Sequence, residues 1–301
     1  MLQYVHMLYF KKSTQYSDKG VIILSILKLK SSLQKEWDKL EKQETALLIK
    51  KNQKKQSALN DFLAEKIPDG LQNTLNKAFC KAFNIMFNKA TGIIEKTYNS
   101  EKAKENAFIN HTLADKPKPS RRSLKRVKNA AGKSAAANLA VSAVSGVGLG
   151  VLGIGIPDIV LFVSLVLKNM YQLATSYNID YHTDTERRFI LTVIQAALSF
   201  GKEQQAADEE LDFFIENGYF ETDKSLNLCI DECAKCMSGE LLYMKFLQGI
   251  PIVGAVGGAF DFIYLKQINE YAKIKYHKRF LSAKMSKQQN RRTCPTHLNT
   301  V

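Results

Sequence analysis

Apolar residues recur at three- and four-residue intervals along most of this 301-residue chain. This spacing places apolar side chains on one face of an α-helix, and Pro68, just before the clearest run, suits the first position of a helix. No stretch alternates polar and apolar residues long enough to predict a sheet. The pattern therefore predicts an all-α fold, a single multi-helix bundle. The clearest run comprises Leu71, Leu75, Phe79, Phe83, Met86, Ala90 and Ile93.

Further helices are expected over residues 31–60 and 223–248, and another from Thr183 onward. Thr183 and Glu186 have the spacing of a capping box, in which hydroxyl and carboxylate bond reciprocally to backbone N–H groups at a helix start. Residues 100–120 contain two prolines among many polar side chains and are predicted to form a loop. A basic helix is expected to begin directly after this loop.

Two segments are rich in glycine and alanine. Gly146 and Gly150 continue a four-residue repeat of small side chains, and Gly254 and Gly258 form a second one. Small residues at this spacing let neighbouring helix backbones approach closely, in bilayers and in soluble bundles alike. We expect the two segments to pack against each other as close-packed helices at the centre of the bundle.

The stretch GLGVLGIGIPDIVLFVSLVLKNM, residues 148–170, allows three interpretations. Its GxGxxG pattern is found in dinucleotide-binding loops, but a strand should precede those glycines and here a helical repeat does. Residues 135–157 are uncharged and long enough to cross an apolar layer of ~30 Å, yet Asp158 follows at once and would be costly at depth. A buried helical hairpin is the favoured interpretation.

Asp158 itself has two possible roles. It either caps a helix by accepting backbone N–H bonds, or it is a buried carboxylate paired with a cation on another helix. Arginines 187 and 188 lie in the first turn of a helix, where positive charge opposes the helix dipole, so an acidic partner is expected for one of them among Asp158, Asp180 and Asp184. The candidate buried polar cluster consists of Asp158, Lys168, Tyr177, Arg187 and Asp261.

The chain is basic, with 43 Lys and Arg against 29 Asp and Glu and a net charge of +14. Such a balance favours an anionic membrane surface or nucleic acid as a partner, although a solvated basic surface has the same composition. Few aromatic residues accompany the basic segments, which makes nucleic acid the less favoured partner. The basic segments are Arg121, Arg122, Lys125, Arg126 and Lys128, and the region from Lys266 through Arg279 to Arg292.

No motif for catalysis, a cofactor or a metal is present in the sequence. The histidines are scattered, and HExxH, GxSxG and paired-acid patterns are missing. Cys229, Cys233 and Cys236 share one helix face without a further ligand beside them, so they are expected to be small core residues. We expect a non-enzymatic protein without cofactor or metal; the alternative is a hydrolase-like cytoplasmic enzyme with its site around Asp158.

The cysteine usage is typical of a reducing compartment. The apolar segment 21–27 is short for a signal peptide and lacks a cleavage site. We therefore expect a cytoplasmic protein that associates with the inner face of the membrane. The expected organisation is a loosely packed extension over 1–30, a helical domain over 31–285 and a basic tail over 286–301.

Three segments in this order resemble the EcsC family of bacterial proteins, named for the third gene of an operon that also encodes an ABC transporter. They are IPDIVLFVSLVLKNMYQLATSYNID, ERRFIL and PIVGAVGGAFDFIYL. The resemblance covers roughly residues 31–285 and implies an all-helical domain without established catalytic residues, linked to ABC-type transport or secretion. Asn178 stands where the family often has Gly, and Asp261 where it often has Asn. Because Asn tolerates a left-handed backbone, the turn after Tyr177 should persist, whereas Asp261 needs a partner.

Overall fold

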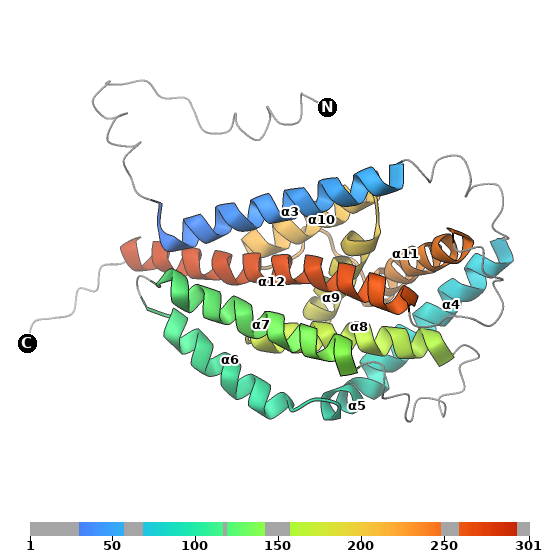
Figure 1. Ribbon diagram of the computed structural model, residues 1–301, viewed down its shortest axis with the longest axis horizontal. Coiled ribbons are helices and arrows are strands. Elements are labelled where there is room, and N and C mark those ends of the chain that lie inside the picture. The colour runs from blue at the N-terminus through green and yellow to red at the C-terminus, as the bar shows by residue number, and fades with distance from the viewer. Residues whose placement is uncertain (1–29, 57–68, 117–118, 142–156, 248–258, 294–301) are drawn as a thin grey trace, which may run out of the picture.

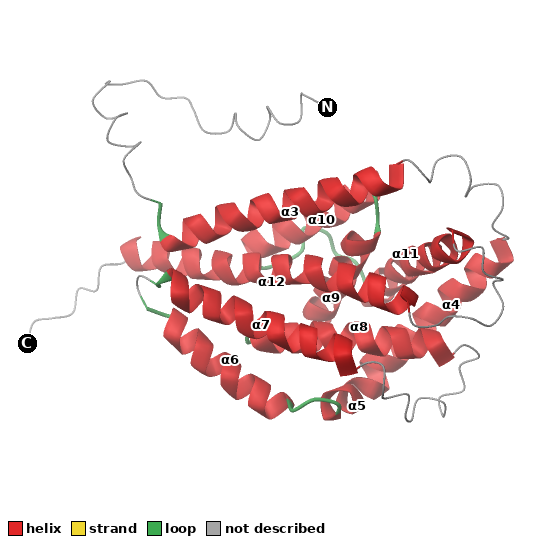
Figure 2. Cartoon of the chain, in the orientation of Figure 1, coloured by secondary structure: helices red, strands yellow, loops and turns green. Residues whose placement is uncertain are grey.

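The computed structural model describes residues 30–56, 69–116, 119–141, 157–247 and 259–293. Within these ranges every regular element is a helix and no strand occurs, which confirms the all-α prediction (Figure 2). The elements are α3 (Ser32–Gln56), α4 (Asp69–Ile85), the π-helix η2 (Met86–Ala90), α5 (Thr91–Lys96), α6 (Ser100–Ala114), α7 (Arg121–Val141), α8 (Pro157–Ser176), α9 (Asp184–Leu198), α10 (Gly201–Asn217), α11 (Leu226–Leu247) and α12 (Ala259–Thr293).

Helix α12 runs lengthwise through the middle of the bundle (Figure 1). It packs against α3, α7, α8, α9 and α10, so neighbours surround it on several sides. Its buried side chains are consequently both apolar and polar, and they include Tyr271, Leu281, His277 and the charged Lys275. Charged groups in such positions require partners on the surrounding helices.

A single hydrophobic cluster contains buried residues from each of the described helices. Helices α8 and α9 lie deepest in it, because most of their side chains are buried. Residues Ile159–Ser176 of α8 are long and apolar enough to cross a membrane, and 89% of this window is buried by the rest of the bundle. The apolar surface of α8 is thus already covered by protein.

Most of the predicted helices are present. The charged helix over 31–60 corresponds to α3, the basic helix to α7, and the helix over 223–248 to α11. The apolar run from Leu71 to Ile93 forms α4, η2 and part of α5. No helix is predicted over 201–217 from the sequence, and the structure shows α10 there.

The loop predicted over residues 100–120 is wrong. Residues Ser100–Ala114 form α6, which the Asn99 side chain caps by accepting a hydrogen bond from the Lys102 backbone N–H at 2.9 Å. Alanine, glutamate and lysine in this segment are good helix formers, and both prolines come after the last helical residue. The segment is polar because only a narrow face, including Ala107 and Ala114, is buried.

The turn after α8 has the expected left-handed residue. Asn178 has φ of 56°, and the backbone N–H of Ile179 donates to the Ala174 carbonyl oxygen at 3.0 Å while that of Asn178 donates to Thr175 at 2.9 Å. These two bonds form a Schellman motif, which ends a helix with one left-handed residue. Asn178 therefore takes the position where glycine is usual, as the sequence predicts.

Several predictions concern residues outside the described ranges. Pro68 is among them, as are all four glycines of the small-residue segments, Gly146, Gly150, Gly254 and Gly258, so the expected packing of those segments stays a prediction. Residues 1–29 of the expected N-terminal extension are likewise not described. The expected boundary at residue 285 falls inside α12, which continues to Thr293.

Candidate functional site

An open groove of about 1240 Å³ lies between α3, α6 and α7. We call it the basic groove, because six cationic side chains line it and Glu36 is the one carboxylate among its described lining residues. Amide side chains and alanines of α6 form one of its walls. The cations are Lys39, Arg121, Arg122, Lys125, Arg126 and Lys128.

The amphipathic pattern of α7 directs its cations into the groove. Leu124, Val127 and Ala131 lie on one face of this helix and are buried in the core. The basic residues of its first two turns occupy the remaining faces and are mostly exposed. Burial of the apolar face fixes the rotation of α7, and this rotation presents the basic face to the groove.

The other two walls follow from the same periodicity. On α3, Glu36 and Gln43 lie two turns apart on one side, while Leu33 and Leu40 are buried on another. On α6, groove-lining residues recur at 103, 106, 107 and 110, which is one helical face. The α6 side chains are small or uncharged, so they leave space in the groove. The amides add hydrogen-bond donors without any negative charge that would offset the cations.

Four α7 cations of the groove, like Lys39 of α3, lack an acidic partner among the described residues. Arg121, Arg122, Lys125 and Arg126 are exposed and form no ion pair with any residue that the structure describes. They occupy the first two turns of α7, whose first turn contains no acidic residue. Because the dipole also makes a helix N-terminus positive, an anion bound here would relieve an unfavourable concentration of positive charge.

Lys128, Glu36 and Gln43 form the floor of the groove, where the charges of Lys128 and Glu36 largely cancel. Lys128 Nζ lies 3.5 Å from Glu36 Oε1 and 3.4 Å from Gln43 Oε1. Burial lowers the pKa of Lys128, and Glu36 partly opposes this effect. The buried carboxylate of Glu36 is therefore countered by Lys128, and the positive charge of the four unpaired α7 side chains remains uncompensated.

Behind the floor lies His277 of α12. Its Nε2 is 3.9 Å from Glu36 Oε1, and its Nδ1 shares a hydrogen bond of 3.2 Å with the Tyr177 hydroxyl. Burial lowers the pKa of His277 to about 3, and Lys128 contributes in the same direction. The imidazole is accordingly neutral at physiological pH and contributes no charge to the groove.

The predicted buried polar cluster does not share one set of contacts among its described side chains. Lys168 donates to the Thr97 carbonyl oxygen at 3.4 Å, and Tyr177 bonds to His277. Arg187 pairs with one of its predicted partners, Asp184, at 3.1 Å and also donates to the Phe87 carbonyl oxygen at 3.1 Å. The side chains of Asp158 and Asp261 lie outside the described residues, although Asp158 is the second residue of α8.

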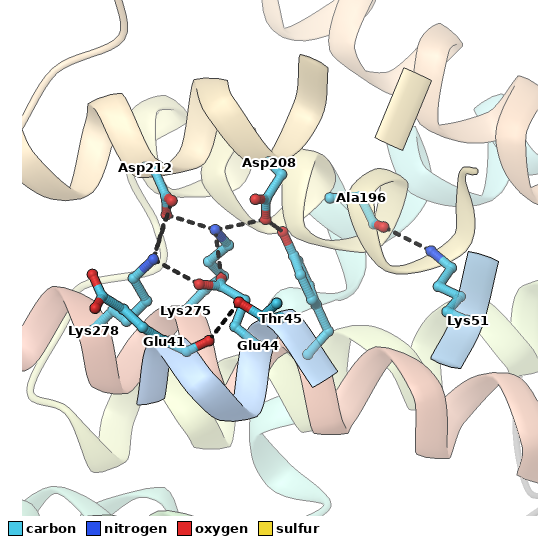
Figure 3. Close-up of polar contacts among 10 residues, drawn as sticks. Glu41, Glu44, Thr45, Lys51, Ala196, Asp208, Asp212, Lys275 and Lys278 are labelled. Carbon is cyan, nitrogen blue, oxygen red and sulfur yellow. Dashed lines mark hydrogen bonds and ion pairs between the residues drawn. The ribbon is translucent and has the colours of Figure 1, made fainter. Parts of the chain in front are cut away.

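Lys275 lies at the centre of an acidic cluster that joins α3, α10 and α12 (Figure 3). Ligand atoms of Glu44, Asp208 and Asp212 are close enough together to hold a metal ion. The ammonium group of Lys275 already lies among them, at 2.8 Å, 2.7 Å and 2.6 Å respectively. We interpret the cluster as a structural connection, because the chain supplies its own cation.

Glu186 forms a second buried connection instead of completing the capping box. Thr183 accepts a hydrogen bond from the Glu186 backbone N–H at 3.2 Å, as predicted. The Glu186 carboxylate, however, accepts a hydrogen bond from the Tyr276 hydroxyl at 2.6 Å and pairs with Arg279. The predicted reciprocal bond is therefore replaced by a contact between α9 and α12. Burial raises the pKa of this carboxyl group, with Arg279 acting against it.

The cysteines of α11 behave as the sequence predicts. Cys229 and Cys233 are buried in the core and Cys236 is half-buried. Burial raises the pKa of the Cys233 thiol well above its usual range, which disfavours the reactive thiolate. These residues are small core side chains.

Sequence reasoning identified only part of the basic groove. The cations of α7 are adjacent in the sequence and were recognisable as a basic segment. Lys39 and Gln43 of α3 and Asn106 and Asn110 of α6 were missed, because only the fold brings their helices beside α7. Within each of these two pairs the residues are four apart, which is the one signal in the sequence that they share a helix face.

Comparison with known proteins identifies the family of the chain. The model of the EcsC protein family matches residues 19–281, which is most of the chain. Protein EcsC of Bacillus subtilis (strain 168) is 33% identical over 145 residues, covering 47% of this chain and 58% of that relative. The match thus spans less than two thirds of the relative's length, and no solved structure matches. From the extent of the family match, we conclude that the chain belongs to the EcsC family.

Proposed function

We propose that this protein is a peripheral membrane accessory factor whose basic groove binds the phosphate groups of anionic lipids. The observation that carries the proposal is the set of four exposed cations on α7 that have no acidic partner among the described residues. Guanidinium groups bind phosphate through paired, charge-assisted hydrogen bonds. Each Lys or Arg near an anionic bilayer contributes about 1 kcal/mol, so four together give reversible attachment of about 4 kcal/mol.

The chemistry of the groove supports binding rather than catalysis. Its one carboxylate, Glu36, is paired with Lys128, and the hydroxyl of Ser176 donates to the Gln172 carbonyl oxygen. The described lining residues therefore provide cations and amides but no nucleophile activated by a base. We propose a regulatory role in ABC-type transport or secretion, which the family resemblance implies and which attachment to the inner membrane face would permit.

Nucleic acid is the competing anionic partner. Single-stranded nucleic acid usually stacks its bases on aromatic side chains. The described lining of the groove contains no aromatic residue, so it offers charge without stacking surfaces. This composition favours a lipid phosphate layer over a polynucleotide.

Vesicle flotation tests the proposal. The variant Arg121→Gln, Arg122→Gln, Lys125→Gln, Arg126→Gln should lose at least roughly a hundredfold in affinity for vesicles containing phosphatidylglycerol, because each cation contributes about 1 kcal/mol. Binding of the unmodified protein should weaken as salt concentration rises, since exposed charges are screened. Vesicles of phosphatidylcholine alone should not be bound.

A matched control removes four positive charges elsewhere. Lys77, Lys81, Lys89 and Lys235 are exposed on other helices, and their replacement by Gln should change binding little. The proposal is overturned if both variants lose affinity equally, because net charge would then explain the attachment. It is also overturned if the protein binds a single-stranded oligonucleotide more tightly than it binds the vesicles.

A further inference from the structure

We propose that α6 is the element that enters the membrane interface, with Ile109 and Leu113 inserting between lipids beside the basic groove. This inference rests on the proposed function and specifies the orientation of the protein on the bilayer. Ile109 is 49% exposed and Leu113 is 38% exposed, although both are large apolar side chains. The bundle leaves them uncovered on the same helix that forms a wall of the groove.

The position of these side chains follows from helical spacing. Asn106 and Asn110 line the groove, and Ile109 and Leu113 each follow one of them by three residues. Residues three apart are neighbours on a helix surface, so the apolar pair borders the α6 wall of the groove. Lys102 lies one turn before Asn106 on the same side of the helix. We call Lys102, Asn106, Ile109 and Leu113 the α6 stripe. It combines one cation, one amide and two apolar side chains.

The side of α6 turned away from Ile109 and Leu113 attaches it to the bundle. Ala114 is buried there, as is Ala107 at the base of the groove wall, and the helix packs against α7 and α8. In Figure 1, α6 lies at the edge of the molecule, next to α7. Its outer surface is therefore open to a partner.

This pairing of charge and apolar surface distinguishes a bilayer from a soluble anion. A free phosphate or a polynucleotide would engage the cations of the groove but would leave Ile109 and Leu113 in water. At a membrane, phosphate groups lie directly above the acyl chains, and amphipathic helices bury their apolar face at this boundary. A lipid surface satisfies both parts of the α6–α7 edge at once, whereas these soluble anions satisfy only the first.

The first experiment removes the apolar pair while keeping every charge. The variant Ile109→Ser, Leu113→Ser should bind vesicles containing phosphatidylglycerol roughly tenfold to thirtyfold more weakly, as expected for two partly exposed aliphatic side chains leaving an apolar phase. The matched control is Tyr219→Ser, Leu228→Ser, which removes two side chains that are 60% and 46% exposed elsewhere. The control should bind like the unmodified protein.

A second experiment measures insertion directly. Trp37 is the one tryptophan of the chain, so Ile109→Trp combined with Trp37→Phe places the fluorophore at the stripe alone. Its emission should shift to shorter wavelength on vesicles and be quenched by lipids brominated on their acyl chains. Inorganic phosphate should cause neither change. The same fluorophore placed by Leu228→Trp in the Trp37→Phe background should not be quenched.

The possible failures are distinguishable. If the unmodified protein does not float with anionic vesicles, both the proposed function and the α6 inference are overturned. If it floats, but the Ile109→Ser, Leu113→Ser variant floats equally well and the fluorophore at position 109 is not quenched, the α6 inference alone is overturned. The groove would then bind lipid phosphates without insertion of the helix.

Discussion

Lys275 and His277 are fully buried on the same helix, yet they differ in charge. Burial alone would lower the pKa of Lys275, but Asp212, Glu44 and Asp208 outweigh it and hold that pKa above its usual value. His277 Nε2 lies 3.9 Å from Glu36 Oε1, but Glu36 is paired with Lys128, whose charge also lowers the pKa of His277. One carboxylate shared with a lysine does not offset the desolvation of an imidazolium, so the ring stays neutral.

The neutral state of His277 predicts a pH dependence of stability. Its pKa is about 3 in the folded protein and about 6.5 in an unfolded chain. Between these values the unfolded state binds more protons, so the free energy of unfolding falls as pH decreases from about 6.5, by up to about 1.4 kcal/mol per pH unit. The variant His277→Gln cannot titrate, so its stability should fall less steeply between pH 6 and pH 4.

Urea unfolding at a series of pH values measures this slope. Buried carboxylates also affect stability in the acid range, so the informative quantity is the difference between variant and unmodified protein. Tyr177→Phe is the control, because it removes the hydroxyl beside Nδ1 but keeps the imidazole and should keep the steep slope. Equal slopes for His277→Gln and the unmodified protein would show that burial of this ring does not control its charge.

At the level of elements, α6 depends on its cap. Asn99 satisfies a backbone N–H group of the first turn, which an isolated helix start would leave without a partner. The variant Asn99→Ala should reduce the free energy of unfolding by about 1 kcal/mol. Its effect should be local, with faster amide hydrogen exchange over the first turn of α6.

The control for this prediction is Asn99→Asp. Aspartate is an equally good cap and its negative charge suits a helix N-terminus, so stability should be kept. A loss of stability in Asn99→Asp as large as that in Asn99→Ala would mean that the amide nitrogen, not the accepted hydrogen bond, is important. Because α6 is a wall of the basic groove, Asn99→Ala should also weaken vesicle binding slightly.

The sequence predicted some elements and missed others for identifiable reasons. Helix α9 has a capping hydroxyl at Thr183 and a broad apolar face, so its start was readable. Helix α6 buries mainly alanines such as Ala107, whose small apolar surface gives almost no periodic signal. Helix α12 was recognised only over its first residues, because later buried positions such as Lys275 and Lys278 carry charge and read as surface positions.

At the scale of the whole molecule, tertiary contacts determine which helices form the basic groove and which charged residues pair, and the local sequence pattern does not show either. The basic segment of α7 indicated an anionic partner from the sequence alone. The groove requires α3 and α6 as well, which lie far from each other in sequence and are brought together beside α7. The contact between Lys128 and Glu36 could likewise not be predicted from the sequence, because 92 residues separate the two.

One shared core predicts one unfolding transition for the described helices. Each of them contributes to a single hydrophobic cluster, and buried ion pairs connect α3 and α10 to α12. Trp37 reports on α3, where the Lys278 ammonium lies 5.5 Å from its ring centroid. Urea transitions followed by Trp37 fluorescence and by far-ultraviolet circular dichroism should therefore coincide. A tryptophan introduced by Leu228→Trp in the Trp37→Phe background, on α11, should give the same midpoint.

An earlier transition at Trp37 would contradict this expectation and would have a functional meaning. Helix α3 supplies Lys39, Gln43 and the carboxylate of Glu36 to the basic groove. If α3 separated first, the groove would lose one wall and the partner of Lys128 while the rest of the bundle stayed folded. Coincident transitions would instead mean that the groove persists as long as the core does, as a preformed binding site requires. Comparing the two midpoints thus tests whether the charged surface is an integral part of the fold.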